Sequence, residues 1–288
     1  MKTRRIIAVV HRGYSWYLPY VLRQVRAHNP RAEIVLFADR ERLILRPFCR
    51  TVRIDDYFAT ARELEPFFEN LSPNSAAYEL FCLQRWAILL EYAKRHDVAE
   101  IVHLDSDVMV YCDLWETIDR AWAGYDFVAT GFQGPQSLFI RNIAALQAFW
   151  DHIIDAYRHQ LADLRTRHAG WLAQGLAGGV SDMHFLHEFI AAGSFRFGDN
   201  AAPVDGALFD EFINQANGFP LRDGIKHVTL AGDRPIGTRA DDGATIAFNT
   251  LHFQGMTKKH IPGFSAPRSL SLPLLGVCNK LHKLGLLS

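Results

Sequence analysis

The sequence lacks any excess of charge of one sign. Among its 288 residues, 31 lysines and arginines balance 31 aspartates and glutamates. A chain without a broad positive field does not attract a nucleic-acid backbone or an anionic membrane through its overall charge. We therefore expect no nucleic-acid partner, and any contact with a phosphate group must come from a few residues at one site.

Cysteine is also scarce, with four residues at positions 49, 82, 112 and 278. They are scattered and form no C-x-x-C pair of the kind that holds structural zinc. We interpret them as reduced thiols of the core in a cytoplasmic protein.

Long hydrophobic runs are missing as well. No stretch approaches the roughly 20 apolar residues that a membrane-spanning helix needs. The basic start is followed by only five apolar residues, 6–10, which is too short for a signal peptide and predicts a first strand instead. We therefore expect a cytoplasmic protein without a membrane span.

The pattern of the chain indicates one catalytic domain, residues 1–265, and a C-terminal tail, 266–288. No repeat or low-complexity linker divides the first part. In the tail, leucines alternate with Lys280, His282 and Lys283, which predicts an amphipathic helix. The tail either docks on the domain, is a frayed end, or makes peripheral contact with the inner face of a membrane.

The hydrophobic periodicity is typical of an α/β protein. Strand 6–10, a helix with Leu18, Val21, Leu22 and Val25 on one face, and strand 33–38 form a βαβ unit. Further strands are predicted at 52–54, 101–104, 127–130 and 137–140, and helices at 76–96, 142–168 and 182–192, with an irregular segment at 61–74. The expected fold is a Rossmann-like core with a mixed, mainly parallel central sheet flanked by helices.

In such folds ligands bind beyond the carboxyl ends of the strands. The first two strands end at His11 and Arg12 and at Asp39, which are therefore candidates for nucleotide binding. Strand 101–104 ends at Asp105-Ser106-Asp107. If this triplet is extended, both carboxylates point the same way and need a cation, for which Mn²⁺ or Mg²⁺ is suited. The alternative is an ordinary surface turn.

Two further charged residues stand in apolar surroundings. Helix 76–96 is apolar nearly all round, so we expect Arg85 to be half-buried and to have an anionic partner. Asp182 begins a helix and is either its N-terminal cap together with Ser181 or a group that binds a substrate. His103 faces away from the aspartates by strand alternation and is interpreted as structural.

Four segments carry a resemblance to a known family. Residues 81–86 and 103–108, followed by 178–183, resemble the central segments of nucleotide-diphospho-sugar glycosyltransferases of the GT-A fold. Residues 251–258, Leu-His-Phe-Gln-Gly-Met-Thr-Lys, are similar to the H-F-x-G-x-x-K signature of the family 8, glycogenin-like group. The likeness runs in order over about residues 1–262.

The resemblance implies a metal-dependent glycosyltransferase that uses a nucleotide-diphosphate sugar, with a UDP-sugar favoured, and a glycan or lipid-linked acceptor. It makes His252 the third ligand of Mn²⁺ or Mg²⁺ beside Asp105 and Asp107. Gly255 then allows close approach of the diphosphate, which Lys258 contacts. It also implies retention at the anomeric carbon.

The remaining candidates complete the expected donor site. Asp105, Ser106 and Arg85 are counted with His11, Arg12 and Asp39 among the donor-binding residues, as are Gly255 and Lys258. Asp182 and Lys258 are counted as catalytic. A general-base role for Asp182 would make the reaction inverting instead.

The chain departs from the family pattern at two places. Lys259 replaces the proline that usually follows the signature lysine, and the loop 11–14 lacks the usual threonine, which leaves the base of the nucleotide open. Two alternatives remain: a nucleotidyltransferase of similar fold and a non-catalytic nucleotide-sugar-binding protein. The sugar, the acceptor and the oligomeric state cannot be read from the sequence.

Overall fold

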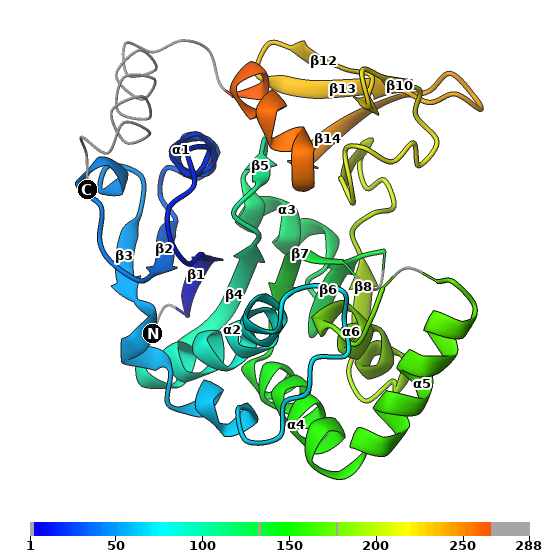
Figure 1. The fold of residues 1–288 in the computed structure, drawn as a ribbon. Helices are drawn as coiled ribbons and strands as arrows, with labels where there is room; N and C mark the ends of the chain where they lie inside the picture. Colours follow the sequence, from blue (N-terminus) through cyan, green and yellow to red (C-terminus); the bar gives the residue numbers. More distant parts are fainter. Residues whose placement is uncertain (1–2, 132–133, 177, 266–288) are drawn as a thin grey trace.

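The computed structural model describes residues 3–131, 134–176 and 178–265, and its centre is a seven-stranded sheet (Figure 1). The strand order is β3-β2-β1-β4-β7-β6-β8, and β7 alone runs antiparallel to its neighbours β4 and β6. The strands are β1 (Arg4–Val10), β2 (Glu33–Ala38), β3 (Arg50–Arg53), β4 (Val98–Leu104), β6 (Phe127–Thr130), β7 (Gly134–Ile140) and β8 (Phe197–Asp199). This confirms the predicted mixed, mainly parallel sheet.

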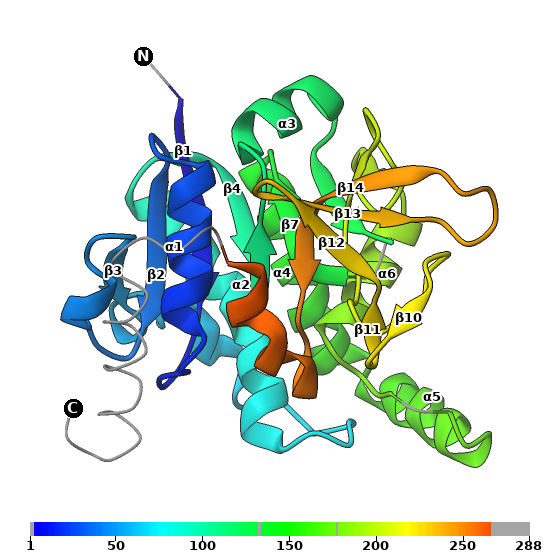
Figure 2. The same cartoon turned by 90° about the horizontal axis from the view of Figure 1, so that it is seen from above.

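Helices cover both faces of this sheet because the residues of its strands alternate between two cores. Ile6, Ala8 and Val10 belong to the core under α2, α4 and α6, whereas Ile7 and Val9 belong to the core under α1 and α3. Figure 2 shows α1 lying across the sheet. The helices are α1 (Leu18–His28), α2 (Ala76–Arg95), α3 (Leu114–Ala121), α4 (Ile143–His159), α5 (Leu161–Ala173) and α6 (Asp182–Ala191).

A second, smaller sheet stands beside the carboxyl end of β4. The chain leaves the central sheet after β4 and forms β5 (Val108–Val110), which pairs with β14 (Thr245–His252). β13 (Arg234–Thr238) and β12 (Val228–Ala231) extend this sheet, and β9 (Ala207–Phe209) pairs with β14 in parallel. A short hairpin, β10 (Leu221–Arg222) and β11 (Ile225–Lys226), flanks it. The end of β14 is thereby brought next to the end of β4.

Three sequence predictions of local structure need correction. The single helix predicted at 142–168 is two helices that meet at Gln160, because Gln160 has non-helical backbone angles, φ −123° and ψ 19°. The strand predicted at 52–54 is β3, which begins two residues earlier, at Arg50, and pairs with β2 in parallel. The segment 61–74 is not wholly irregular, since Thr60–Leu64 forms a 3₁₀ helix.

Three of the four cysteines can be placed. Cys49 is buried, Cys82 and Cys112 are half-buried, and all three are free thiols. Cys278 and the predicted tail helix lie outside the described residues. Within residues 3–265 as described, no helix is both long and apolar enough to cross a membrane.

Candidate functional site

The Asp105-Ser106-Asp107 triplet forms a tight turn between β4 and β5. The amide of Val108 donates to the Asp105 carbonyl at 3.1 Å, and the Asp105 amide donates to the Gln136 carbonyl on β7 at 2.9 Å. The prediction that an extended strand aligns the two carboxylates was therefore wrong. A turn brings them together because β5 leaves the central sheet to join β14.

The pairing of β5 with β14 adds His252 to these carboxylates. His252 lies opposite Val108 in the register of the two strands. Ligand atoms of Asp105, Asp107 and His252 all lie within 4.8 Å of one another, and His252 Nε2 is 3.4 Å from Asp107 Oδ1. The structure thus brings together the three residues that the sequence analysis expected at a metal site.

The orientation of the His252 ring is fixed from its other side. Its Nδ1 donates to the Glu211 carbonyl at 2.7 Å, so the lone pair of the neutral ring lies on Nε2, toward the aspartates. Two carboxylates and one imidazole nitrogen form a donor set that Mn²⁺ and Mg²⁺ accept. The residues therefore fit a divalent ion of this class.

The charges at this site influence one another strongly. Burial disfavours the charged forms of His252 and Asp107. Without a metal ion, however, the protonated His252 ring donates from Nε2 to Asp107, and this interaction raises the pKa of His252. For Asp107, burial likewise opposes ionisation, yet His252 and Lys258 lower its pKa to about 2. Asp107 is therefore a carboxylate over the whole physiological pH range.

Lys258 and Gly255 follow β14 in a 3₁₀ helix, Gly255–Phe264, which also includes Lys259. Lys258 Nζ lies 2.7 Å from Asp107 Oδ2. Gly255 has φ +56°, a left-handed conformation that favours glycine, and a Cβ added there would meet no protein atom within 4 Å. The left-handed backbone conformation alone explains why residue 255 is a glycine. Gly255 also lines a cavity, which accounts for the open space beside its Cα.

Arg85 is more deeply buried than predicted and has two anionic partners. It projects from α2 and donates to Asp105 Oδ1 at 2.6 Å and to Asp182 Oδ2 at 2.5 Å. Trp86 Nε1 donates to the same Asp182 oxygen at 3.2 Å. Burial raises the pKa of Asp182 although Arg85 opposes this effect. Ser181, not Asp182, caps α6, since its hydroxyl accepts from the His184 amide.

The first loop lies on the other side of the triplet. His11 Nδ1 is 2.9 Å from Ser106 Oγ, and Asp39 Oδ2 accepts from the Gly13 amide at 2.5 Å. The Arg12 guanidinium stacks on Phe81, 4.3 Å from the ring centre. Of the six donor-binding candidates other than Gly255 and Lys258, four contact one another at the triplet, His11 with Ser106 and Arg85 with Asp105. Arg12 packs on Phe81 of α2, and Asp39 binds the backbone of the first loop.

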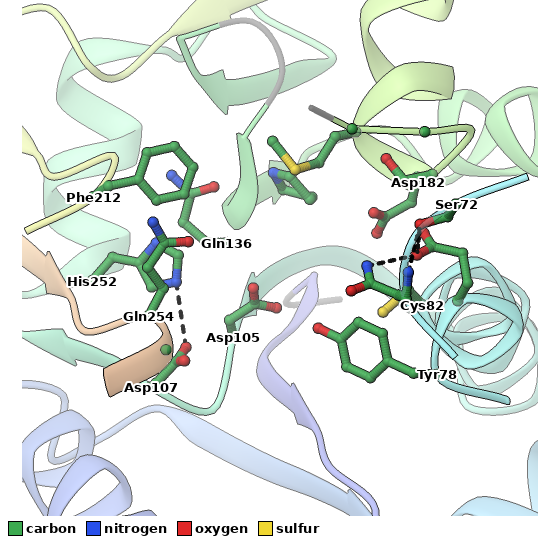
Figure 3. Close-up of a pocket in the computed structure, with 18 of the residues that line it drawn as sticks. Ser72, Tyr78, Cys82, Asp105, Asp107, Gln136, Asp182, Phe212, His252 and Gln254 are labelled. Atoms are coloured by element: carbon green, nitrogen blue, oxygen red, sulfur yellow. Dashed lines mark hydrogen bonds and ion pairs between the residues drawn. The ribbon is translucent and has the colours of Figure 1, made fainter. Parts of the chain in front are cut away.

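Two cavities meet at the aspartates. The smaller one, of about 260 Å³, is lined by His11, Arg12, Tyr17 and Phe81, among others. The larger one, of about 370 Å³, extends toward Gln136, Asp182 and Phe212. Both share Arg85, Asp105, Asp107 and Lys258. In Figure 3, Asp105 lies between the side that carries Asp107 and His252 and the side that carries Asp182.

A buried ion pair that the sequence analysis missed supports His252. Lys226 Nζ lies 2.7 Å from Asp210 Oδ1, and both side chains are about 1% exposed. Asp210 Oδ2 accepts from the His252 amide at 3.2 Å, and the neighbouring Glu211 carbonyl holds the His252 ring. No local signal reveals the pair, because the two residues stand on separate segments without helical or strand periodicity.

Replacing Lys226 with methionine is expected to lower the free energy of unfolding by about 3 kcal/mol, because it leaves the Asp210 carboxylate buried without a cation. Urea unfolding followed by circular dichroism measures the change. The double variant Lys226→Met/Asp210→Leu should recover part of the loss. Equal stability of wild type and single variant would show that the pair does not hold this segment.

His103 lies nearer the aspartates than strand alternation predicted, because its Nε2 is 3.9 Å from Asp105 Oδ1. It provides a pH-dependent prediction. The ring is fully buried beside Arg85, and burial first, then the Arg85 charge, lowers its pKa from 6.5 to about 4. Between these two values the unfolded chain binds a proton that the folded protein does not, so stability falls as the pH falls through this range. The contribution is about 3 kcal/mol, as 1.36 kcal/mol per pH unit.

The measurement compares unfolding free energies of wild type and His103→Gln from pH 7 to pH 4. The unfolding free energy of wild type minus that of His103→Gln should become steadily smaller, or more negative, as the pH falls, whatever its value at pH 7. A difference that stays constant over the range would contradict a neutral buried imidazole.

Comparison with known proteins gives little at the level of sequence. No protein-family model matches the chain, and no curated protein matches it significantly. Among solved structures, an active-site mutant of LgtC is 12% identical, with a TM-score of 0.44 over 94% of this chain and 99% of that one. Another LgtC structure is described as a galactosyltransferase in complex with donor and acceptor sugar analogs.

Two other solved structures also match. Mouse xyloside xylosyltransferase 1 is 13% identical, with a TM-score of 0.42 over 68% of this chain and 85% of that one. A cytidylyltransferase from Leptospira borgpetersenii serovar Hardjo-bovis is 13% identical, with a TM-score of 0.37 over 71% of this chain and 77% of that one. At such identities and TM-scores we draw no conclusion about activity from the likeness.

Proposed function

We propose that this protein is a metal-dependent glycosyltransferase that moves a sugar from a nucleotide-diphosphate donor, with a UDP-sugar favoured, to a glycan or lipid-linked acceptor. The observation that carries the proposal is the convergence of Asp105, Asp107 and His252, with Lys258 beside them, where two cavities meet. A single cavity would suffice for a nucleotide alone. Two cavities joined at a cation-binding centre suit a diphosphate with a different group on each side.

The donor is proposed to lie across this centre, with the nucleoside in the smaller cavity. That cavity has Tyr17 and Phe81 in its wall and Arg12 stacked on Phe81, so it offers aromatic surface and a cation to a base and ribose. The transferred sugar then lies in the larger cavity. We propose that His11 and Ser106 border the phosphate nearer the nucleoside.

The residues around the centre provide charge and orientation for loss of the nucleoside diphosphate. A bound Mn²⁺ or Mg²⁺ supplies Lewis-acid neutralisation of the charge that develops on the diphosphate. Lys258 places its ammonium at the same point and stabilises that charge further. Arg85 holds the carboxylates of Asp105 and Asp182 in fixed positions.

Asp182 is proposed to bind hydroxyls on the sugar side. Arg85 and Trp86 both donate to its Oδ2, and among the described residues no hydrogen bond reaches its Oδ1. This leaves Oδ1 as an acceptor for a sugar or acceptor hydroxyl. Retention at the anomeric carbon stays a prediction from the family resemblance.

The proposal is tested by turnover. The purified protein is incubated with UDP-glucose, UDP-galactose and GDP-mannose, with Mn²⁺ or with a chelator, and release of nucleoside diphosphate is measured. We expect release from at least one donor that depends on the metal and is stimulated by an acceptor glycan. Tight nucleotide-sugar binding with no turnover for any acceptor would favour a binding protein.

A nucleotidyltransferase is the second candidate, because paired carboxylates beyond a parallel strand also serve that chemistry. Such an enzyme would join the nucleotide of a nucleoside triphosphate to a sugar phosphate and release pyrophosphate. The first loop, Val10 to Gly13, contains a single glycine and one arginine, which is a poor cradle for a triphosphate. We therefore favour sugar transfer, and a pyrophosphate assay separates the two.

A further inference from the structure

Glu79 is a buried carboxyl group in the wall of the larger cavity. It belongs to the first turn of α2, is 2% exposed and lines the cavity together with Asp182. Its Oε2 accepts from Ser72 Oγ at 2.9 Å and from Asn74 Nδ2 at 2.9 Å. These bonds anchor the segment before α2 to the helix and fix the carboxyl group in place.

The other charged groups in the wall of this cavity are already paired. Arg85 bridges Asp105 and Asp182, and Lys258 contacts Asp107. Within the part of the chain that the structure describes, no lysine, arginine or histidine forms an ion pair with Glu79. The far end of the cavity therefore has more carboxylates than cations.

This arrangement limits what the cavity accepts. Hydroxyl groups of an uncharged sugar donate to carboxylate oxygens, and such charge-assisted hydrogen bonds are strong in a partly desolvated site. A carboxylate on the sugar would instead face Glu79 and Asp182, and the one cation nearby in the cavity wall, Arg85, already neutralises Asp105 and Asp182. Like-charge contacts of this kind reject wrong ligands strongly.

We propose that Glu79, with Ser72 and Asn74, forms a selectivity subsite that accepts transferred sugars without a carboxylate, such as neutral hexoses, and rejects uronic-acid donors. The inference rests on the proposed function, because it requires the sugar to lie in this cavity. The cavity reaches from Asp105 to Glu79, so a sugar attached to a diphosphate at the aspartates extends toward the subsite.

The test is a calorimetric comparison of UDP, UDP-glucose and UDP-glucuronate in the presence of Mn²⁺. The two sugars differ only at the sixth carbon, where glucose has a hydroxymethyl group and glucuronate has a carboxylate. For the wild type we expect UDP-glucuronate to bind at least about tenfold more weakly than UDP-glucose. Equal affinities for the two sugars would overturn the inference and leave the proposed function intact.

The variant Glu79→Gln removes the charge and keeps the shape of the side chain. It should narrow the difference between the two donors to less than about threefold, whereas Glu116→Gln, at an exposed site on α3, should leave it unchanged. An unchanged difference in a folded Glu79→Gln protein would assign the selectivity to another group. If UDP itself does not bind, the proposed function fails and this inference fails with it.

Discussion

Replacing Asp107 with asparagine is expected to weaken binding of Mn²⁺ to the nucleotide-free protein by at least about a hundredfold. The side chain keeps its shape but loses the charge that attracts a cation. Asp107 has a pKa of about 2, so the wild type provides a full carboxylate at neutral pH. Titration of free Mn²⁺ by electron paramagnetic resonance measures the change directly.

Asp55→Asn serves as the matched control, because Asp55 is an exposed carboxylate paired with Arg53 away from the site. It should bind Mn²⁺ like the wild type. The same affinity in Asp107→Asn as in these two proteins would mean that the aspartates and His252 do not form a metal site.

Removing the charge of Arg85 is expected to have the largest effect on stability. Arg85→Met leaves Asp105 and Asp182 without their shared cation, and Asp182 is only 6% exposed. Breaking a buried pair from one side typically costs 3–5 kcal/mol, and two carboxylates place this case at about 5 kcal/mol. For a chain of this size the melting temperature should fall by on the order of 10 °C.

Two further variants test whether the loss of stability comes from the bridge between Arg85 and the two carboxylates. Arg85→Lys keeps a charge but loses the planar fork that reaches both carboxylates, so its melting temperature should lie between those of wild type and Arg85→Met. Arg46→Met, which breaks an exposed pair with Glu41, should show no measurable change. If Arg85→Met melts like the wild type, the bridge is not a structural support of the site.

The strands β1, β2, β4 and β6 and the second half of β7 were predictable because each contains a short apolar run with a clear end, whereas β3 and β8 contain no such run. The position of the Asp105-Ser106-Asp107 triplet beyond β4 followed from the same pattern. The contact between His252 and Asp107 did not, since it depends on β5 leaving the sheet and pairing with a strand about 140 residues later. Only the similarity of residues 251–258 to the H-F-x-G-x-x-K signature connected His252 with Asp107.

Most of the site contacts that could not be predicted join residues that are distant in the sequence. Burial of Arg85 indicated an anionic partner, but Asp182 lies 97 residues away on α6, and no spacing rule joins two helices. Glu79 was overlooked because an acidic residue in the first turn of a helix is ordinarily explained by the helix dipole. The Glu211 carbonyl that orients His252 belongs to the backbone and has no signature in the sequence.

The proposed function requires a divalent ion and a nucleoside diphosphate to bind together at Asp105, Asp107 and His252. Calorimetric titration of UDP and of GDP into the protein, with Mn²⁺ and with chelator, tests it most directly. We predict that UDP binds with Mn²⁺ and that its affinity falls at least about a hundredfold with chelator. Absence of binding by both nucleotides under both conditions would contradict the proposed function.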